Sequence, residues 1–364
     1  MKNIFGKAIL LATALLFSIT GTSCSNDDNT TPEKEKTYDM SGFAKGADVS
    51  WLTEMEKDGV KFYNQNGKAT ECMKLLREEG TNSIRLRVWV NPEGGWCGKN
   101  DVIAKAWRAQ QLGFRLMIDF HYSDTWADPG NQKVPAAWQG YTVEQMKQAV
   151  ADHTKDVLKA LKDRGVTNVE WVQVGNETRD GMLWNSDEAV TAQVSKNAAN
   201  FAAYINAGYD AVKEVYPNAK VIVHVDQGQD LGGLTWLYDN LKENGGKWDV
   251  IGLSLYPEDD NWQGYAESCL SNIQTLSSMY GKDVIISEIG MWWGSNQAAP
   301  MMKKMVDGCK AISTCEGIFY WEPEVYNNWK PANYVTLGWD AYTKGAFDNS
   351  GKPTAVFDAY KNIK

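Results

Sequence analysis

Two hydrophobic patterns alternate along the chain from residue 46 onward. Short runs rich in Val, Ile and Leu are typical of buried strands, and longer segments with apolar residues at helical spacing are typical of amphipathic helices. The predicted strands are 47–49, 83–89, 114–122, 170–177, 219–226, 249–256, 284–290 and 317–321. The predicted helices are 70–79, 101–112, 143–164, 188–215, 231–244, 265–280, 298–311 and 354–362.

These segments make eight consecutive strand–helix units, without an internal repeat and without a linker after residue 45. Strands that alternate with helices form parallel sheets, and eight such units close into a barrel. The predicted fold is therefore α/β, a single (β/α)8 TIM barrel. We expect residues 43–364 to form this one domain.

Two of the predicted strands end on a glutamate. Glu177 ends a strand that contains the β-branched Val172 and Val174 and leaves through Gly175, and Glu288 ends a similar run. One such glutamate could equally cap a helix or be a solvated charge. Two glutamates in matching positions instead suggest a paired-carboxylate enzyme.

Polar side chains cluster at the ends of the predicted strands. Besides the two glutamates, they are Asp48, Arg87, His121, Asn176, Asp226, Tyr256 and Trp321. In a TIM barrel the carboxyl ends of the strands carry the active site. Taken alone, Arg87 could form a structural ion pair, His121 could be a satisfied core histidine, and Tyr256 could be packing. Their common location at the carboxyl ends of the strands favours one shared active site.

Two carboxyl groups can hydrolyse a glycosidic bond. One protonates the leaving oxygen and the other stabilises an oxocarbenium-like centre, provided that their pKa values differ. A cation such as Arg87 near Glu288 would keep that carboxylate ionised, and a hydrogen bond from Tyr256 would hold it in line. Asn176 is placed to meet the sugar 2-hydroxyl, and Trp321 would form an apolar floor.

Composition narrows the class of ligand. The chain has 16 Trp and 16 Tyr, and aromatic faces suit sugar rings, although about half of the Trp residues are expected in the core. A net charge of −9 argues against nucleic acid as a partner. The three histidines have no zinc-like spacing and no Gly-rich phosphate loop is present, so no metal or nucleotide is expected.

The first 23 residues have the pattern of a signal peptide. Lys2 and Lys7 precede the apolar run 8–17, which is too short for an ordinary membrane span. Small residues before Cys24 resemble a bacterial lipoprotein cleavage site, which would make Cys24 the lipidated first residue. The alternative is ordinary cleavage that leaves Cys24 unmodified.

The segment 24–42 is polar and contains Pro32, which predicts a flexible tether. Its acidic start, 25–29, resembles the signal that sends lipoproteins of Bacteroidetes-type bacteria to the cell surface. We therefore expect an outer-membrane, surface-exposed lipoprotein. The other cysteines are Cys72, Cys97, Cys269, Cys309 and Cys315. That compartment permits disulfides, Cys309 and Cys315 are the easiest pair to propose, and an odd count leaves one thiol free.

Several longer motifs together resemble one enzyme family. They are 46–50 (GADVS), 85–89 (RLRVW), 119–124 (DFHYSD), 126–129 (WADP), 174–177 (VGNE) and 287–288 (SE). This set is similar to glycoside hydrolase family 53, the endo-β-1,4-galactanases that cut galactan side chains of pectin. The resemblance extends from about residue 43 to the C-terminus.

The resemblance implies retention of anomeric configuration, with Glu177 as general acid/base and Glu288 as nucleophile. It also implies an extended cleft with several sugar subsites. The further candidate substrate contacts are Asp48, Trp89, Trp126, Asp128, His224, Trp292 and Trp293. Trp292 and its neighbour Trp293 could equally be packing.

Some members of this family carry a structural calcium near strands six to eight. Here the segment after Glu288 is short and 258–261 is a weak acidic cluster, so calcium is not favoured. We expect no required cofactor and a monomer. Two other functions stay open, a non-catalytic surface glycan-binding lipoprotein and another specificity of the same clan, such as a β-mannanase or cellulase.

Overall fold

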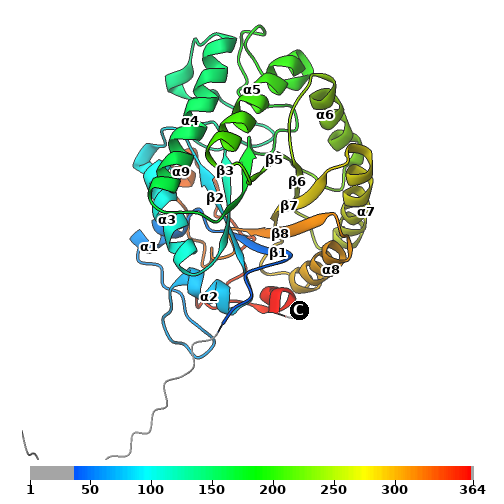
Figure 1. The fold of residues 1–364 in the computed structure, drawn as a ribbon. Coiled ribbons are helices and arrows are strands. Elements are labelled where there is room, and N and C mark those ends of the chain that lie inside the picture. The colour runs from blue at the N-terminus through cyan, green and yellow to red at the C-terminus, as the bar shows by residue number, and fades with distance from the viewer. Residues whose placement is uncertain (1–36, 362–364) are drawn as a thin grey trace, which may run out of the picture. The chain divides into compact units, whose positions relative to one another are not determined.

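The computed structural model describes residues 37–361, which form a closed barrel of eight parallel strands with helices on its outer side (Figure 1). The strands are β1 Ala44–Asp48, β2 Ser83–Val88, β3 Arg115–Phe120, β4 Val169–Val174, β5 Lys220–Val225, β6 Val250–Leu255, β7 Asp283–Ile289 and β8 Cys315–Trp321. They neighbour one another in chain order, and β8 closes onto β1. The predicted (β/α)8 barrel is confirmed.

The predicted helices are present, with changes at some ends. The α-helices are α1 Leu52–Lys57, α2 Cys72–Glu78, α3 Lys99–Gln111, α4 Val143–Asp163, α5 Val194–Val215, α6 Leu231–Glu243, α7 Trp262–Tyr280, α8 Ala298–Ala311, α9 Ala332–Leu337 and α10 Asp358–Lys361, and short 3-10 turns are η1 Glu93–Gly95, η2 Ala136–Trp138 and η3 Ala355–Phe357. The predicted helix 188–215 starts only at Val194, because Asp180 accepts a 2.7 Å hydrogen bond from the Ser195 backbone and fixes the start of the helix there.

The barrel interior has an apolar end and a polar end. Ala44, Met117, Trp171, Ile222, Val250, Ile285 and Phe319 form a buried cluster that is separate from the larger core under the helices. Gly46 makes room for it, because a Cβ there would lie 2.1 Å from the Phe319 ring. The inward positions nearer the carboxyl ends are polar, so the fold places polar side chains at one end of the barrel.

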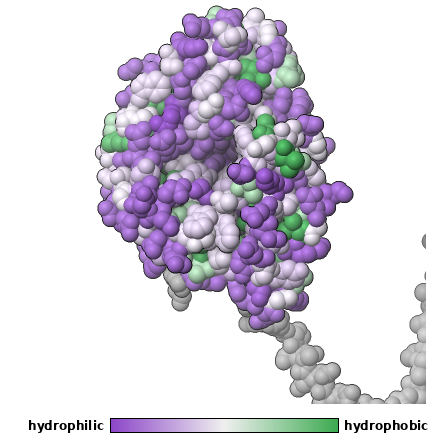
Figure 2. All heavy atoms as spheres, turned by 180° about the vertical axis from the view of Figure 1, so that it is seen from behind, coloured by the Kyte–Doolittle hydropathy of each residue, from purple (hydrophilic) through white to green (hydrophobic). Residues whose placement is uncertain are grey.

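Several predictions concern residues outside the described range. The signal peptide 1–23, Cys24 and most of the tether 24–42 lie outside residues 37–361. Within the described residues, no helix is long and apolar enough to cross a membrane. The surface of the described part is mostly hydrophilic, with scattered hydrophobic groups, and it is hollowed near the centre of the face shown in Figure 2.

The proposed Cys309–Cys315 disulfide is wrong for this structure. All five cysteines of the described part are free and buried: Cys72, Cys97, Cys269, Cys309 and Cys315. Cys309 lies on the buried side of α8 and Cys315 starts β8. They contribute to the core as small apolar side chains, which is the usual role of a buried free thiol.

Candidate active site

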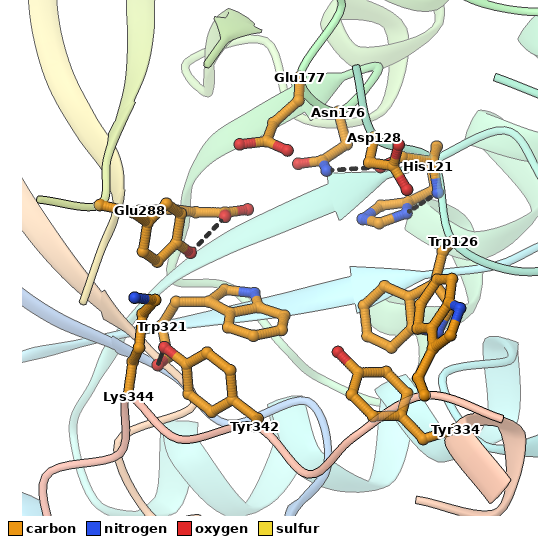
Figure 3. A pocket seen from close by; sticks show the side chains of 13 residues that line it. His121, Trp126, Asp128, Asn176, Glu177, Glu288, Trp321, Tyr334, Tyr342 and Lys344 are labelled. Carbon is orange, nitrogen blue, oxygen red and sulfur yellow. Dashed lines mark hydrogen bonds between the residues drawn. The ribbon is translucent and has the colours of Figure 1, made fainter. Parts of the chain in front are cut away.

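The predicted catalytic residues meet at a pocket on the carboxyl-terminal side of the strands. The pocket has a volume of about 280 Å³. Its lining residues are His121, Trp126, Ala127, Asp128, Asn176, Glu177, Tyr256, Glu288, Trp321, Tyr334, Trp339, Tyr342 and Lys344. Glu177 and Glu288 enter from two sides of this pocket, above an aromatic floor and wall (Figure 3).

Glu288 lies between a cation and a phenol. Arg85 Nη2 is 2.9 Å from Oε1, and the Tyr256 hydroxyl donates a 2.7 Å hydrogen bond to Oε2. The predicted contact with Tyr256 is therefore present. The prediction that Arg87 supplies the cation is wrong. Both arginines are on β2, and the guanidinium of Arg87 pairs with Glu322 Oε1 at 3.1 Å instead.

Arg85 is held by groups from neighbouring strands. Its Nη1 is 2.6 Å from Asp48 Oδ2, and its Nη2 is 2.9 Å from Asp119 Oδ2 and from Asn176 Oδ1. Asp48 was predicted to contact substrate, but it is fully buried and binds Arg85. Asp48 therefore supports Arg85, because it pairs with the guanidinium that also contacts Glu288.

Glu177 is positioned by backbone strain and by a hydroxyl. Its φ of 46° is left-handed, and it follows Gly175 with φ 82°. Ser254 donates a 2.7 Å hydrogen bond to Glu177 Oε1, and His224 Nε2 lies 2.7 Å from the same serine oxygen. Because the single hydroxyl proton goes to Glu177, the network assigns a proton to His224 Nε2.

His224 was predicted to contact substrate, but it is fully buried and does not line the pocket. Its Nδ1 accepts from the Glu177 backbone N–H at 3.4 Å and lies 3.0 Å from Gln173 Nε2. Burial lowers the pKa of His224 well below its ordinary value, and Arg85 lowers it further. The neutral ring therefore supports Glu177 from below the pocket.

The two glutamates have different electrostatic surroundings. Burial raises the pKa of Glu177 well above its ordinary value, and the nearby Glu288 carboxylate raises it further. Burial also raises the pKa of Glu288, to about 7, against the opposing effects of Arg85 and the Tyr256 hydroxyl. Because only Glu288 has an adjacent cation, a proton shared between the two carboxyls is held on Glu177.

Asn176 and His121 line the pocket as predicted. The Asn176 amide donates a 2.9 Å hydrogen bond to the Ala127 carbonyl, which fixes its orientation beside Glu177. His121 Nε2 lies 3.0 Å from Asp119 Oδ2, and its Nδ1 accepts from the Ala127 backbone N–H at 3.2 Å. Asp128 also lines the pocket.

Arg87 and Trp89 do not reach the pocket, contrary to prediction. Arg87 is buried, and its guanidinium carbon lies 4.3 Å from the Trp126 ring centroid, 5.1 Å from that of Trp89 and 5.9 Å from that of Trp321. Cation–π contacts of this kind and the pairing with Glu322 compensate its charge. Arg87 therefore lies behind the aromatic floor that Trp126 and Trp321 present to the pocket.

Trp292 and Trp293 were also predicted to contact substrate. Their side chains are 45% and 44% exposed, and neither lines the catalytic pocket. The Trp292 ring instead packs over Gly294, where a Cβ would lie 2.5 Å from the indole.

Four of the lining residues that were not predicted from the sequence lie after β8: Tyr334, Trp339, Tyr342 and Lys344. Tyr334 and Trp339 rings are 5.1 Å apart, and Tyr342 is 4.7 Å from Trp321. The segment 322–354 has no strand pattern, and α9 is too short to show a helical period. The available signal was the concentration of aromatic residues between a strand end and the last helix.

Among the described residues, the acidic and imidazole groups near the pocket form no metal site. Across residues 37–361, no group of three or more His, Cys, Asp or Glu side chains is arranged to hold a metal ion. The carboxylates of Asp48 and Asp119, which act electrostatically on Glu288, are already paired with Arg85. The site therefore offers two carboxyl groups with different proton affinities, amide and imidazole hydrogen bonds, and aromatic surface.

Curated proteins similar to this chain include galactanases. The endo-β-1,4-galactanase of Bacillus subtilis is 31% identical over 83% of this chain and 75% of its own length. The arabinogalactan endo-β-1,4-galactanase of Thermothelomyces thermophilus is 28% identical over 88% of this chain and 99% of its own length. An uncharacterized protein of Niallia circulans is 36% identical over 70% of this chain and 69% of its own length.

Solved structures that resemble this chain also include a galactanase. A fungal β-1,4-galactanase superposes with a TM-score of 0.77 at 27% identity, covering 89% of this chain and 100% of that one. The Ignisphaera aggregans GH53 catalytic domain gives a TM-score of 0.77 at 27% identity, covering 88% of this chain and 96% of that one. Since the pattern of glycosyl hydrolase family 53 also matches residues 44–299, this chain belongs to glycosyl hydrolase family 53.

Proposed function

We propose that the protein is an endo-acting, retaining β-1,4-galactanase in which Glu288 is the nucleophile and Glu177 the general acid/base. The observation that carries the assignment is the contrast between the two carboxyl groups. Glu288 is 2.9 Å from Arg85, whereas Glu177 accepts only from the neutral Ser254 hydroxyl. The cation favours a carboxylate at Glu288, and burial without a cation favours a carboxylic acid at Glu177.

In the first step, Glu288 attacks the anomeric carbon while Glu177 donates its proton to the leaving glycosidic oxygen. This gives a covalent glycosyl-enzyme and releases the first product. In the second step, Glu177 removes a proton from water, the water oxygen bonds to the anomeric carbon, and the bond to Glu288 breaks. The two inversions retain the configuration, and Glu177 regains its proton.

The side chains around the pair suit the sugar that reacts. Trp321 presents an apolar face below the position between the two glutamates, and Asn176 presents its amide beside Glu177 (Figure 3). A hydrogen bond from this amide to the sugar 2-hydroxyl would strengthen in the transition state. The carboxyl groups carry both steps, so we propose that neither metal nor cofactor is required.

Similarity to the galactanases of Bacillus subtilis and Thermothelomyces thermophilus supports galactan as the substrate. We propose the galactan side chains of pectin, including arabinogalactan, as the natural polymer. We also propose that the mature chain is a monomer anchored to the outer membrane through lipidated Cys24 and displayed at the cell surface. Replacing Cys24 by serine should release the protein from membranes, and continued membrane association would contradict the anchor.

The activity can be tested with residues 38–364, the compact unit that contains the barrel. Reducing-sugar release would be followed on β-1,4-galactan, with β-mannan and cellulose alongside, with and without EDTA. We expect short oligosaccharides from galactan alone, unchanged by EDTA, with the β anomer as the first product seen by NMR. Cleavage of mannan or cellulose would overturn the specificity, and an initial α anomer would overturn retention.

The Glu177→Gln and Glu288→Gln variants complete this test. Both substitutions keep the size of the side chain, and each should lower kcat by several orders of magnitude. Thermal unfolding and circular dichroism would confirm that the variants are folded. Near-normal activity in either folded variant would remove that glutamate from the mechanism.

A further inference from the structure

A second cavity lies beside the catalytic pocket and shares no lining residue with it. It has a volume of about 470 Å³, compared with about 280 Å³ for the catalytic pocket. Its lining residues include Trp293, Asn296, Gly345, Asp348, Asn349 and Thr354. We call it the Trp293 cavity. Its volume is within the range of about 300–1,000 Å³ that is usual for ligand sites.

Neighbouring residues of one segment line the two cavities. Lys344 lines the catalytic pocket (Figure 3), and the next residue, Gly345, lines the Trp293 cavity. The Trp293 backbone N–H donates a 2.9 Å hydrogen bond to the carbonyl of Thr343, so the loop after β7 is tied to this segment. Gly345 packs so closely that a Cβ would lie 1.9 Å from the Val325 carbonyl oxygen. These contacts tie the wall of the Trp293 cavity to the segment that lines the catalytic pocket.

The chemistry of the lining suits a neutral sugar. The Trp293 side chain is 44% exposed, and an exposed indole offers a flat apolar face. Asn296 and Asn349 are exposed beside it and can both donate to and accept from hydroxyl groups. An exposed aromatic surface next to amide groups matches a pyranose, which has apolar ring faces and a hydroxyl edge.

Charge argues against an acidic ligand. Within the part of the chain that the structure describes, neither lysine nor arginine lines the Trp293 cavity. Its carboxylate, that of Asp348, accepts hydrogen bonds from the Ser350 hydroxyl at 2.6 Å and the Lys352 backbone at 3.1 Å. An anionic polymer such as polygalacturonate would meet this negative charge without a compensating cation.

We propose that the Trp293 cavity is a second, non-catalytic binding site for neutral glycan chains, which holds polysaccharide next to the catalytic pocket. The identification of the bound polysaccharide as galactan rests on the proposed function. The inference that the bound sugar is neutral rests on the lining of the cavity alone. Such a site would raise the local concentration of polymer at the active site, because a chain held here stays within reach of Glu288.

The test compares Trp293→Ala with a matched control, Trp236→Ala. Trp236 is a 41% exposed indole on α6 that lines neither cavity. In the inactive Glu177→Gln background, we expect Trp293→Ala to raise Kd for polymeric galactan roughly fivefold, which corresponds to about 1 kcal/mol. Trp236→Ala should leave Kd unchanged, and thermal unfolding would confirm that both variants are folded.

Kinetics in the active enzyme provide a second measurement. Trp293→Ala should raise KM for the polymer and leave kcat/KM for a short chromogenic galactobioside unchanged, because Trp293 does not line the catalytic pocket. Asn349→Ala should act in the same direction with a smaller effect. Equal Kd values for Trp293→Ala and its parent on every neutral glycan tested would overturn the proposal.

Failure of the site can be distinguished from failure of the proposed function. If the wild-type enzyme does not cleave galactan, retention on insoluble mannan, xylan and cellulose still reports whether Trp293 contributes to glycan binding. If the enzyme cleaves galactan and Trp293→Ala changes neither Kd nor KM, only the second site is wrong. Trp293-dependent binding of polygalacturonate would overturn the neutral-sugar chemistry.

Discussion

The Nη2 atom of Arg85 lies 2.9 Å from Oε1 of Glu288, and both side chains are buried at the polar end of the barrel. The same guanidinium also pairs with Asp48 and Asp119. One cation therefore faces three carboxylates from three different strands. Its charge determines whether Glu288 can remain ionised in a site from which water is largely excluded.

Replacing Arg85 by alanine should both inactivate and destabilise the enzyme. The change leaves Asp48, Asp119 and Glu288 without their cation, and breaking a buried ion pair in this way costs about 3–5 kcal/mol. Urea unfolding measures this loss. The control is Arg108→Ala, whose pairs with Glu56 and Glu71 are partly exposed and should cost less than about 1 kcal/mol. Equal losses for the two variants would contradict the role of Arg85.

Replacing Tyr256 by phenylalanine should move the acidic limb of the pH–rate profile to higher pH. The Tyr256 hydrogen bond lowers the pKa of Glu288, so its removal raises that pKa above the value of about 7. The nucleophile must be ionised, and more alkaline conditions are then needed to ionise it. The profile of kcat/KM reports this pKa in the free enzyme. An acidic limb that stays in place or moves down would contradict the assignment of Glu288.

Replacing Ser254 by alanine should move the alkaline limb to higher pH. The Ser254 hydrogen bond lowers the pKa of Glu177, so without it the proton stays on Glu177 at higher pH. The general acid must be protonated, and activity therefore persists further into the alkaline range. Ser195→Ala is the matched control, because its hydroxyl binds Asp180 at the start of α5. A shift of the acidic limb instead would exchange the roles of the two glutamates.

Reducing agents should not change the melting temperature of the barrel. The five cysteines in residues 37–361 are free, so there is no cross-link for dithiothreitol to cleave. Burial raises the pKa of several of these thiols, including Cys72 and Cys269, which also makes them unreactive toward alkylating agents in the native state. A lower melting temperature after reduction, measured on residues 38–364, would show that a disulfide forms.

Most of the fold follows from local pattern. The eight strands are short apolar runs, and the helices between them are long enough to show a 3.6-residue period, so α4 and α8 begin at the predicted residues. The segments that were missed, α1 and α9, are six residues each and show no period. The start of α5 depends on the side chain of Asp180, which is fourteen residues upstream of Val194 and invisible to a local pattern.

Part of the active site could also be predicted from local sequence pattern. Placing Glu177 and Glu288 at strand ends required only the order of elements, because parallel strands bring their carboxyl ends to one side of a barrel. The sequence could not show whether Arg85 or Arg87 is the cation beside Glu288, since alternation puts both side chains on one face of β2. The aromatic residues Tyr334, Trp339 and Tyr342 reach the pocket only through the path of an irregular segment.

The sequence by itself determined the eight strand–helix units, the catalytic end of the barrel and the two glutamates. The tertiary structure decided where the side chains point. Ile285 faces the inner cluster and Ile286 the outer core, so strict alternation would place Glu288 with Ile286, outside the barrel. The β6–β7 register instead shifts from Leu253↔Ile286 to Ser254↔Glu288. This irregularity skips Ser287 and turns Glu288 inward, because an extra residue in one strand reverses the face of the next side chain.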